Sequence, residues 1–268
     1  MLFHLLQKYP QMQRVVINDI NPHLITAYRT IKDTPKQLIE QLSAMEAHYL
    51  SLAGKEAQKD FYLETRKTFN EKTLDEVART CLLIFLNRTC FNGLYRENSK
   101  GKFNVPFGSY SNPTICHKET ILADSELLNR AHVTIVHGDF ADTMQYIDDE
   151  GINFVYLDPP YRPINTTSYF TSYVRQDFND EEQIRLRNFA QLLNERLGVY
   201  WMLSNSDAST INPADRFLED IYNEYYINRV YASRAINSNP AKRGKLTELL
   251  ICNYPSQNHG LNVAEDFE

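Results

Sequence analysis

The sequence predicts an α/β fold, in which a doubly wound, mainly parallel sheet carries an inserted helical and hairpin domain. Short β-branched or aromatic runs, such as 133–136 and 154–157, alternate with segments whose apolar residues recur every three or four positions. This alternation stops over 87–113, where glycine and proline interrupt the chain repeatedly. We therefore assign residues 1–33 and 120–268 to the sheet-containing domain and residues 34–119 to the insertion.

The N-terminal part of the chain predicts one strand followed by helices. Residues 15–17 are β-branched, and Asn21-Pro22 then supplies a helix cap and a first-turn proline. Single apolar stripes predict further helices over 38–52 and 74–87. The remaining expected elements are strands at 133–136, 154–157, 199–203, 226–231 and 249–252, with helices after Asp139 and near Asp180.

The composition is that of an ordinary globular protein, with 43% hydrophobic and 23% charged residues. No apolar run approaches the roughly 20 residues of a membrane span, and no leader-like segment opens the chain. We expect a cytoplasmic protein with no membrane partner. The four cysteines are scattered without zinc-ligand spacing, so we predict no metal site.

The net charge of −6 hides two basic stretches. Residues 85–118 hold five basic side chains and one acidic one, and residues 228–245 hold five basic side chains and no acidic one. Such stretches suit phosphate contacts if they fold to one face, and the alternative is two solvated loops. The basic residues are Arg88, Arg96, Lys100, Lys102 and Lys118, then Arg229, Arg234, Lys242, Arg243 and Lys245.

Three aspartates follow predicted strands, Asp19, Asp139 and Asp158, and we expect all three to line a cofactor site. Ligands of doubly wound sheets lie beyond the carboxyl ends of the strands. Asp19 is placed to bind the ribose hydroxyls of a nucleoside cofactor. Asp139 is placed to accept from the amino group of its adenine, with Phe140 packed on the ring. The alternative for each aspartate is a helix cap.

The third strand runs into Asp158-Pro159-Pro160-Tyr161. The Asp158 carboxylate and the Pro159 carbonyl would accept the two hydrogens of an exocyclic amino group such as adenine N6. They would thereby favour a pyramidal nitrogen whose lone pair is free to react. The two prolines restrict the loop, and Tyr161 offers a ring for a base that has left the duplex. The alternative is an Asp-Pro turn after a buried strand.

These motifs resemble those of the Dam-type adenine-N6 methyltransferases, the class-alpha family whose catalytic motif is Asp-Pro-Pro-Tyr. Residues 18–22 resemble the family's ribose-binding segment, 137–140 its adenine-binding segment, 203–207 the strand beyond the catalytic loop, and 234–254 its closing hairpin. The resemblance implies a Rossmann-like methyltransferase fold, S-adenosylmethionine as cofactor and double-stranded DNA as partner. It covers almost the whole chain.

The most specific likeness lies in residues 87–96 and 101–108, which resemble the family's target-recognition hairpin. The resemblance implies that Phe91 wedges into the duplex and that Asn92 and Arg96 read base edges. It further implies that Leu94 and Pro106 touch a thymine methyl group, with Arg88 also on the DNA, and that the target is GATC. The alternative is an ordinary aromatic loop.

In one respect the sequence departs from the family. The family's Pro-Phe-x-Gly-x-Gly turn has no counterpart before residues 15–17. We therefore expect the first strand to be missing and the chain alone to bind S-adenosylmethionine weakly or not at all. A start codon placed too late, an enzyme split over two chains, or a decayed gene would each explain this.

Three functions compete. The leading hypothesis is a site-specific DNA adenine-N6 methyltransferase, in a restriction-modification system or a maintenance role. A second is methylation of another planar amine, such as a glutamine side chain or an RNA base, and the hairpin argues against it. The third is a truncated or split-enzyme subunit that binds DNA but is inactive alone.

Overall fold

The computed structural model describes residues 1–12, 14–149, 151–164, 178–196, 198–232 and 246–255. The chain divides into two compact units, Met1–Thr143 (unit 1) and Met144–Glu268 (unit 2). Residues 34–119, the expected insertion, lie inside unit 1.

Unit 1 combines a short parallel sheet with a group of helices. Strand β1 (Val15–Asp19) pairs in parallel with β2 (Val133–His137), so that Asp19 lies opposite His137. Helix α2 (Pro22–Asp33) follows β1 directly, because the Asn21 side chain caps it by accepting from the His23 N–H. The other elements of unit 1 are α1 (Leu2–Lys8), α3 (Pro35–Ser51), α4 (Gly54–Glu71), α5 (Glu76–Thr89), η1 (Phe91–Gly93), α6 (Lys118–Arg130) and η2 (Phe140–Tyr146), the last of which runs on into unit 2.

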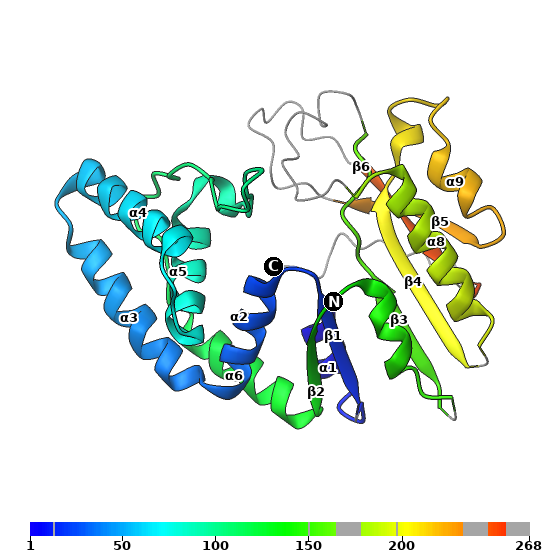
Figure 1. Cartoon of the computed structure of the whole chain (residues 1–268), viewed down its shortest axis with the longest axis horizontal. Helices are drawn as coiled ribbons and strands as arrows, with labels where there is room; N and C mark the ends of the chain where they lie inside the picture. The colour runs from blue at the N-terminus through cyan, green and yellow to red at the C-terminus, as the bar shows by residue number, and fades with distance from the viewer. Residues whose placement is uncertain (13, 150, 165–177, 197, 233–245, 256–268) are drawn as a thin grey trace. The chain divides into compact units, whose positions relative to one another are not determined.

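Helices α3, α4 and α5 form the core of the helical group (Figure 1). The apolar stripes predicted over 38–52 and 74–87 are buried here, with Leu38, Tyr49 and Phe85 fully inside. Helix α4 is absent from the sequence-based prediction. Its buried face mixes Tyr62 and Phe69 with the polar Gln58 and Thr65, which weakens the apolar periodicity.

The segment between α5 and α6 folds back on itself, as the sequence predicts. Antiparallel bridges pair Cys90 with Phe107 and Glu97 with Phe103. The two sides approach so closely at Gly108 that a Cβ atom there would lie 2.3 Å from the Cys90 carbonyl oxygen. Only glycine fits this position, and the approach closes the base of the hairpin.

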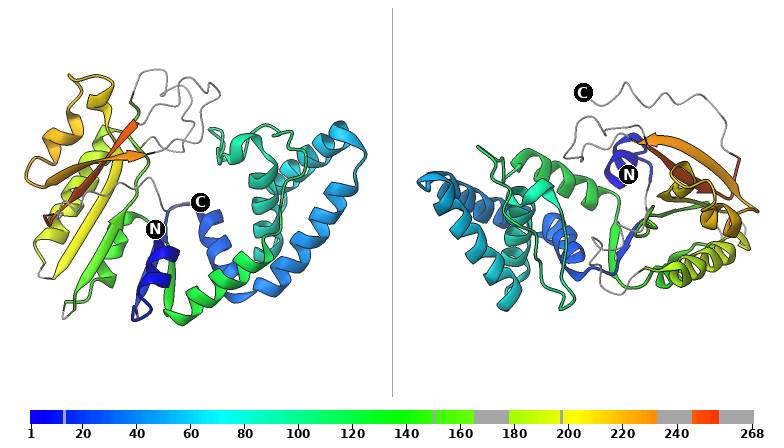
Figure 2. Two further views of the ribbon diagram at one scale, coloured as in Figure 1. Left: turned by 180° about the vertical axis from the view of Figure 1, so that it is seen from behind. Right: turned by 90° about the horizontal axis from the view of Figure 1, so that it is seen from above.

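Unit 2 is built on a four-stranded sheet of order β3-β4-β6-β5. β3 and β4 are parallel, whereas β6 runs antiparallel to both β4 and β5. Figures 1 and 2 show α8 and α9 on one face of this sheet. Trp201 of β4 is fully buried, and its ring centre lies 6.3 Å from that of Tyr222, the residue after α9. The elements are β3 (Asn153–Leu157), α8 (Asp180–Asn194), β4 (Val199–Ser206), η3 (Ala208–Thr210), α9 (Phe217–Ile221), β5 (Tyr226–Ala232) and β6 (Leu246–Cys252).

The α/β class and the parallel pairing are confirmed, and the closing hairpin adds antiparallel pairs, so the described strands form mixed rather than mainly parallel sheets. The helix expected after Asp139 is the 3-10 turn η2. The absence of a first strand stays a prediction. No helix of the described residues is long and apolar enough to cross a membrane, and none of their side-chain groups has the make-up of a metal site.

Candidate functional site

Asp158 stands exposed at the carboxyl end of β3. The parallel pairing of β3 with β4 places Leu157 opposite Leu203, which brings the next residue of β4, Ser204, beside the carboxylate. The buried Ser204 hydroxyl donates to Asp158 Oδ1 over 2.9 Å, and the Tyr156 hydroxyl donates to Ser204 Oγ over 3.0 Å. Burial raises the pKa of Tyr156, so its phenol stays protonated and can donate. One carboxylate oxygen of Asp158 is thereby fixed in direction.

The two prolines of the loop differ in their hydrogen bonds. The Pro160 carbonyl accepts from Gln183 Nε2 on α8 over 3.1 Å, and Gln183 is fully buried. Among the described residues, none donates a hydrogen bond to the Pro159 carbonyl. Pro159 thus presents an acceptor beside the exposed carboxylate of Asp158.

Tyr161 is held at its hydroxyl. The Tyr161 hydroxyl donates to Glu248 Oε2 on β6 over 3.2 Å. Burial raises the pKa of Tyr161 to about 12, so the phenol remains neutral near pH 7 and keeps this bond.

The strand ends of unit 1 bring Asp19, Asp139 and Phe140 to one edge of the β1–β2 sheet, as the sequence predicts. The Gly138 N–H donates to the Asp19 carbonyl over 3.2 Å, and Asn18 Nδ2 donates to the Asp139 carbonyl over 2.7 Å. Each aspartate also caps its own turn: Asp19 accepts from the Asn21 N–H and Asp139 accepts from the Ala141 N–H. Each aspartate therefore caps its turn through Oδ1, and capping does not exclude a role in ligand binding.

One feature of this edge fits a nucleoside cofactor. Asn18 Oδ1 is buried and has no hydrogen-bond partner within the described part of the chain. Buried acceptors are normally satisfied, so this oxygen is suited to a donor on a ligand. At the neighbouring Gly138, a Cβ atom would lie 2.6 Å from Asp142 Oδ2, so a larger residue there would require the Asp142 carboxylate to move.

The hairpin residues expected on DNA are displayed at the surface of unit 1. Phe91 and Leu94 are 48% and 38% exposed, large fractions for apolar side chains. Asn92 adopts a left-handed conformation (φ 54°), which Asn tolerates better than most residues. Arg96 is half-buried and donates from Nε to Asn104 Oδ1 over 2.8 Å. Arg88 and Pro106 are exposed as well.

Helix α4 holds the hairpin through its main chain, a role that the sequence did not reveal. Tyr62 and Arg66 both donate to the Val105 carbonyl, over 2.7 and 2.9 Å. Asn70 donates to the Phe103 carbonyl and accepts from its N–H, over 2.9 and 2.8 Å. These partners lie 33 to 43 residues apart in the chain, beyond the reach of a local pattern.

The second basic stretch requires a correction. Arg229 lies on β5 rather than in a loop, and it forms ion pairs with Asp207 over 2.9 Å and Glu219 over 2.7 Å. The two carboxylates are buried, whereas 47% of the Arg229 side chain is exposed, so the pairs lie at the surface of unit 2. The other members, Arg234, Lys242, Arg243 and Lys245, lie outside the described residues.

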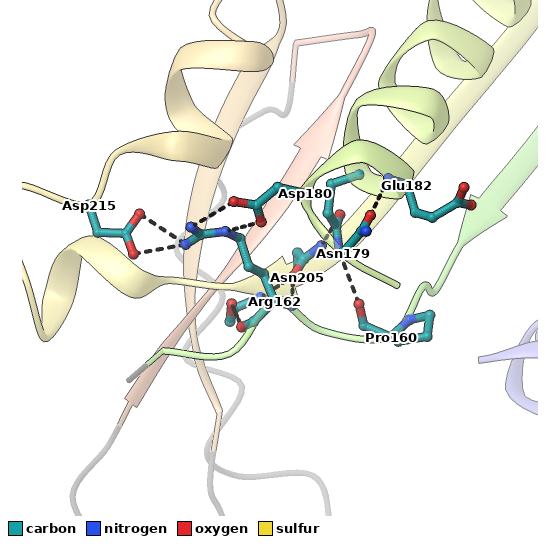
Figure 3. A network of polar contacts seen from close by, with 9 residues as sticks. Pro160, Arg162, Asn179, Asp180, Glu182, Asn205 and Asp215 are labelled. Atoms are coloured by element: carbon teal, nitrogen blue, oxygen red, sulfur yellow. Dashed lines mark hydrogen bonds and ion pairs between the residues drawn. The ribbon is translucent and has the colours of Figure 1, made fainter. Parts of the chain in front are cut away.

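Arg162 is a further site residue that the sequence did not single out. It follows Tyr161 directly, and its guanidinium lies between Asp180 and Asp215 (Figure 3). Its main-chain N–H donates to Asn205 Oδ1 over 2.9 Å. The predicted catalytic residues and their partners thus come together in unit 2. Of the predicted cofactor residues, Asp19, Asp139 and Phe140 lie in unit 1, as do the hairpin residues, whereas Asp158 lies in unit 2.

The chain is similar to known proteins over most of its length. The family model of the D12 class N6 adenine-specific DNA methyltransferases matches residues 1–236. The Type II methyltransferase M.MjaIII of Methanocaldococcus jannaschii is 45% identical over 256 residues, which are 94% of this chain and 84% of the relative.

Two further relatives extend the comparison. The Type II methyltransferase M1.LlaDCHI of Lactococcus lactis subsp. cremoris is 40% identical over 245 residues, 90% of this chain and 80% of the relative. The DNA adenine methylase of Escherichia coli strain K12 is 31% identical over 243 residues, again 90% and 80% of the two chains. The chain belongs to the D12 class of N6 adenine-specific DNA methyltransferases.

Proposed function

We propose that this chain transfers the methyl group of S-adenosylmethionine to N6 of an adenine in double-stranded DNA, with GATC as the target sequence. The observation that carries the proposal is the exposed Asp158 carboxylate beside the Pro159 carbonyl. Ser204 holds one carboxylate oxygen, and no described residue donates to that carbonyl. The relatives named Type II methyltransferases further support a role in restriction-modification.

In the proposed reaction the two acceptors act on the nitrogen. Asp158 accepts one N6 hydrogen and the Pro159 carbonyl accepts the other, which draws the nitrogen lone pair out of the purine plane. The Ser204 hydroxyl occupies Asp158 Oδ1, so Oδ2 is the oxygen that meets the base. Tyr161 stacks on the extruded adenine, and its bond to Glu248 keeps the ring in place.

The cofactor is assigned to the edge of the β1–β2 sheet. S-adenosylmethionine supplies an electrophilic methyl group on its sulfonium. Asp19 binds the ribose hydroxyls, Asp139 accepts from the adenine amino group, and Phe140 packs on the adenine ring. The buried, unpartnered Oδ1 of Asn18 supports a ligand at this edge.

DNA is assigned to the insertion, residues 34–119. Phe91 enters the duplex, Asn92 and Arg96 read base edges, and Leu94 with Pro106 contacts a thymine methyl group, while Arg88 contributes charge. Phe91 and Leu94 are both exposed in one loop and are therefore available to a partner, which supports this assignment.

The test is transfer of a labelled methyl group to two plasmids that differ only in their GATC sites. The expected result is incorporation into the GATC plasmid alone, protection of those sites from methylation-sensitive cleavage, and no incorporation with Asp158→Ala. Labelling of RNA or protein instead would overturn the proposal. If the chain binds DNA but transfers nothing, a DNA-binding subunit that needs a second chain replaces it.

A further inference from the structure

Arg162 is almost completely enclosed, with 12% of its side chain exposed. Nε and Nη2 donate to the two oxygens of Asp180 over 2.8 and 3.2 Å, and Nη1 donates to the two oxygens of Asp215 over 2.9 and 2.8 Å. Figure 3 shows the guanidinium between these carboxylates. Paired geometry of this kind is specific to arginine, because lysine cannot present parallel N–H groups.

The pairing makes Arg162 unsuited to the DNA backbone. Two carboxylates surround one guanidinium, and its carbon also lies 4.7 Å from the centre of the Phe217 ring. Hydrogen bonding to Asp180, ahead of that to Asp215, raises the pKa of Arg162 above its ordinary value. A phosphate would have to displace these partners, so the contacts favour a role inside unit 2.

The main chain of Arg162 is held as firmly as its side chain. Its N–H donates to Asn205 Oδ1 over 2.9 Å, and its carbonyl accepts from Ser206 Oγ over 2.5 Å. Asn205 Nδ2 in turn donates to Gln183 Oε1, whose amide nitrogen donates to the Pro160 carbonyl. Asn205 and Gln183 are fully buried. A continuous chain of amides therefore ties the end of the catalytic loop to β4 and α8.

The loop is consequently fixed on both sides of its reactive atoms. Ser204 holds Asp158 at the start of the loop, and the contacts of Arg162 hold its end. The Pro159 carbonyl lies between these anchors. Only three residues separate Asp158 from Arg162 in the sequence, so a shift of Arg162 is transmitted to the carbonyl direction.

We infer that Arg162 is a positioning residue for methyl transfer, which rests on the proposed function. By bridging Asp180 and Asp215 it sets the direction of the Pro159 carbonyl and of the Asp158 carboxylate, without touching DNA or cofactor. Misplacing a reacting group by about 1 Å costs on the order of 100-fold in rate. Loss of the bridge should therefore slow the chemical step rather than weaken binding.

The experiment compares Arg162→Met and Arg162→Lys with the wild-type full-length chain. Single-turnover methyl transfer on a GATC duplex gives the rate of the chemical step, and titration gives the Kd for DNA. A duplex with 2-aminopurine in place of the target adenine reports base extrusion by its fluorescence. We expect both variants to lose about 10- to 100-fold in rate, with Kd and the 2-aminopurine signal unchanged within about 2-fold.

Arg187→Met is the matched control. Arg187 lies on α8, is 22% exposed, and pairs with Glu224 while donating to the Ile221 carbonyl. Within the described residues, its hydrogen bonds do not reach the catalytic loop. It should lose stability in the same way as Arg162→Met and keep the wild-type rate. A second variant, Asp215→Asn, leaves Arg162 and Asp180 in place and should reduce the rate less than Arg162→Met.

The inference is overturned if Arg162→Met and Arg187→Met transfer methyl groups at the same single-turnover rate. It is also overturned if Arg162→Met binds DNA more weakly but keeps the wild-type single-turnover rate. If Arg162→Met fails to fold, the rate of soluble Asp215→Asn decides, and a wild-type rate there is contrary evidence. A wild-type chain that transfers no methyl group would instead remove the proposed function, and this inference with it.

Discussion

In the catalytic loop of unit 2, the side chain and the main chain of Arg162 are both bonded, whereas helix α4 bonds the recognition hairpin of unit 1 at main-chain atoms. The Arg162 guanidinium pairs with two aspartates, and Asn205 and Ser206 bond its N–H and carbonyl. Helix α4 instead bonds the carbonyls of Phe103 and Val105 and leaves the neighbouring side chains exposed. Catalysis requires a few reacting atoms to be fixed in direction. Recognition requires a fixed backbone, while the side chains that it carries can vary with the target sequence.

The largest effect is expected at Asp158. Replacing it by Asn keeps the shape but exchanges a charged acceptor for an amide, so methyl transfer should fall by about 1,000-fold with DNA affinity retained. A labelled-methyl assay measures the rate, and a fluorescence titration measures the affinity. Asp149→Asn, which changes an exposed aspartate of unit 2, is the control and should remain active. An active Asp158→Asn enzyme would contradict the catalytic assignment.

A change in the hairpin should alter the preference for GATC over other sequences. The methylation rate of GATC at saturating DNA should stay the same. Arg96→Ala removes a bidentate donor, which corresponds to about 10- to 100-fold in discrimination between bases. Methylation of GATC and of single-mismatch duplexes, compared at low enzyme concentration, provides the measurement. Arg185→Ala on α8 serves as the control for loss of one exposed arginine. Equal losses on every duplex would assign Arg96 to the phosphates.

The ion pair of Arg229 with Asp207 should make the stability of unit 2 depend on pH. Although burial opposes ionisation, hydrogen bonds from Thr247, Ser209 and Arg229, among others, lower the pKa of Asp207. A lowered folded-state pKa stabilises the fold above the unfolded value of about 3.9, and this contribution is lost as the pH falls through the folded-state pKa.

Asp207→Asn should therefore cost about 1–3 kcal/mol at neutral pH, and less as the pH falls below about 4. Urea unfolding at several pH values measures the difference. A pH-independent difference would show that the charge of Asp207 contributes nothing to stability.

The smallest effect concerns the frame of the hairpin. Tyr62→Phe removes one buried donor to the Val105 carbonyl, but Arg66 still donates to the same oxygen, so the loss should be about 1 kcal/mol or less. Thermal unfolding gives the loss, and sequence preference should stay at the wild-type value. Asn70→Ala removes both bonds to Phe103 and should cost more. A Tyr62→Phe enzyme with altered preference would show that this frame is not rigid.

The features that depend on neighbouring residues in the chain, namely strand ends and turns, were predicted from the sequence. The strand ends at Asp19, Asp139 and Asp158 follow from β-branched runs that end in a cap or an Asp-Pro turn. The turn at Gly101 and the close approach at Gly108 likewise follow from the position of glycine, whereas the hairpin over 90–107 was predicted from the family resemblance. These features depend on neighbours in the chain, so a single sequence contains the required information.

The partners of these residues were not predictable in the same way. Ser204 reaches Asp158 across 46 residues, and Glu248 reaches Tyr161 across 87, because strand order decides which side chains meet. For the same reason the ion pair of Arg229 with Asp207, which the pairing of distant segments creates, was not predicted. Helix α4 was missed because its buried face includes the polar Gln58 and Thr65, which weaken the apolar periodicity.

The main-chain bonds from α4 have a consequence for the evolution of this enzyme. The residues that hold the hairpin, Tyr62 and Asn70, bind peptide groups that every amino acid possesses. Mutations at Phe91 or Leu94 can therefore accumulate without dismantling the support beneath them. A descendant can acquire a new target sequence while its fold stays intact, and a laboratory library confined to the exposed hairpin positions should retain a high fraction of folded members.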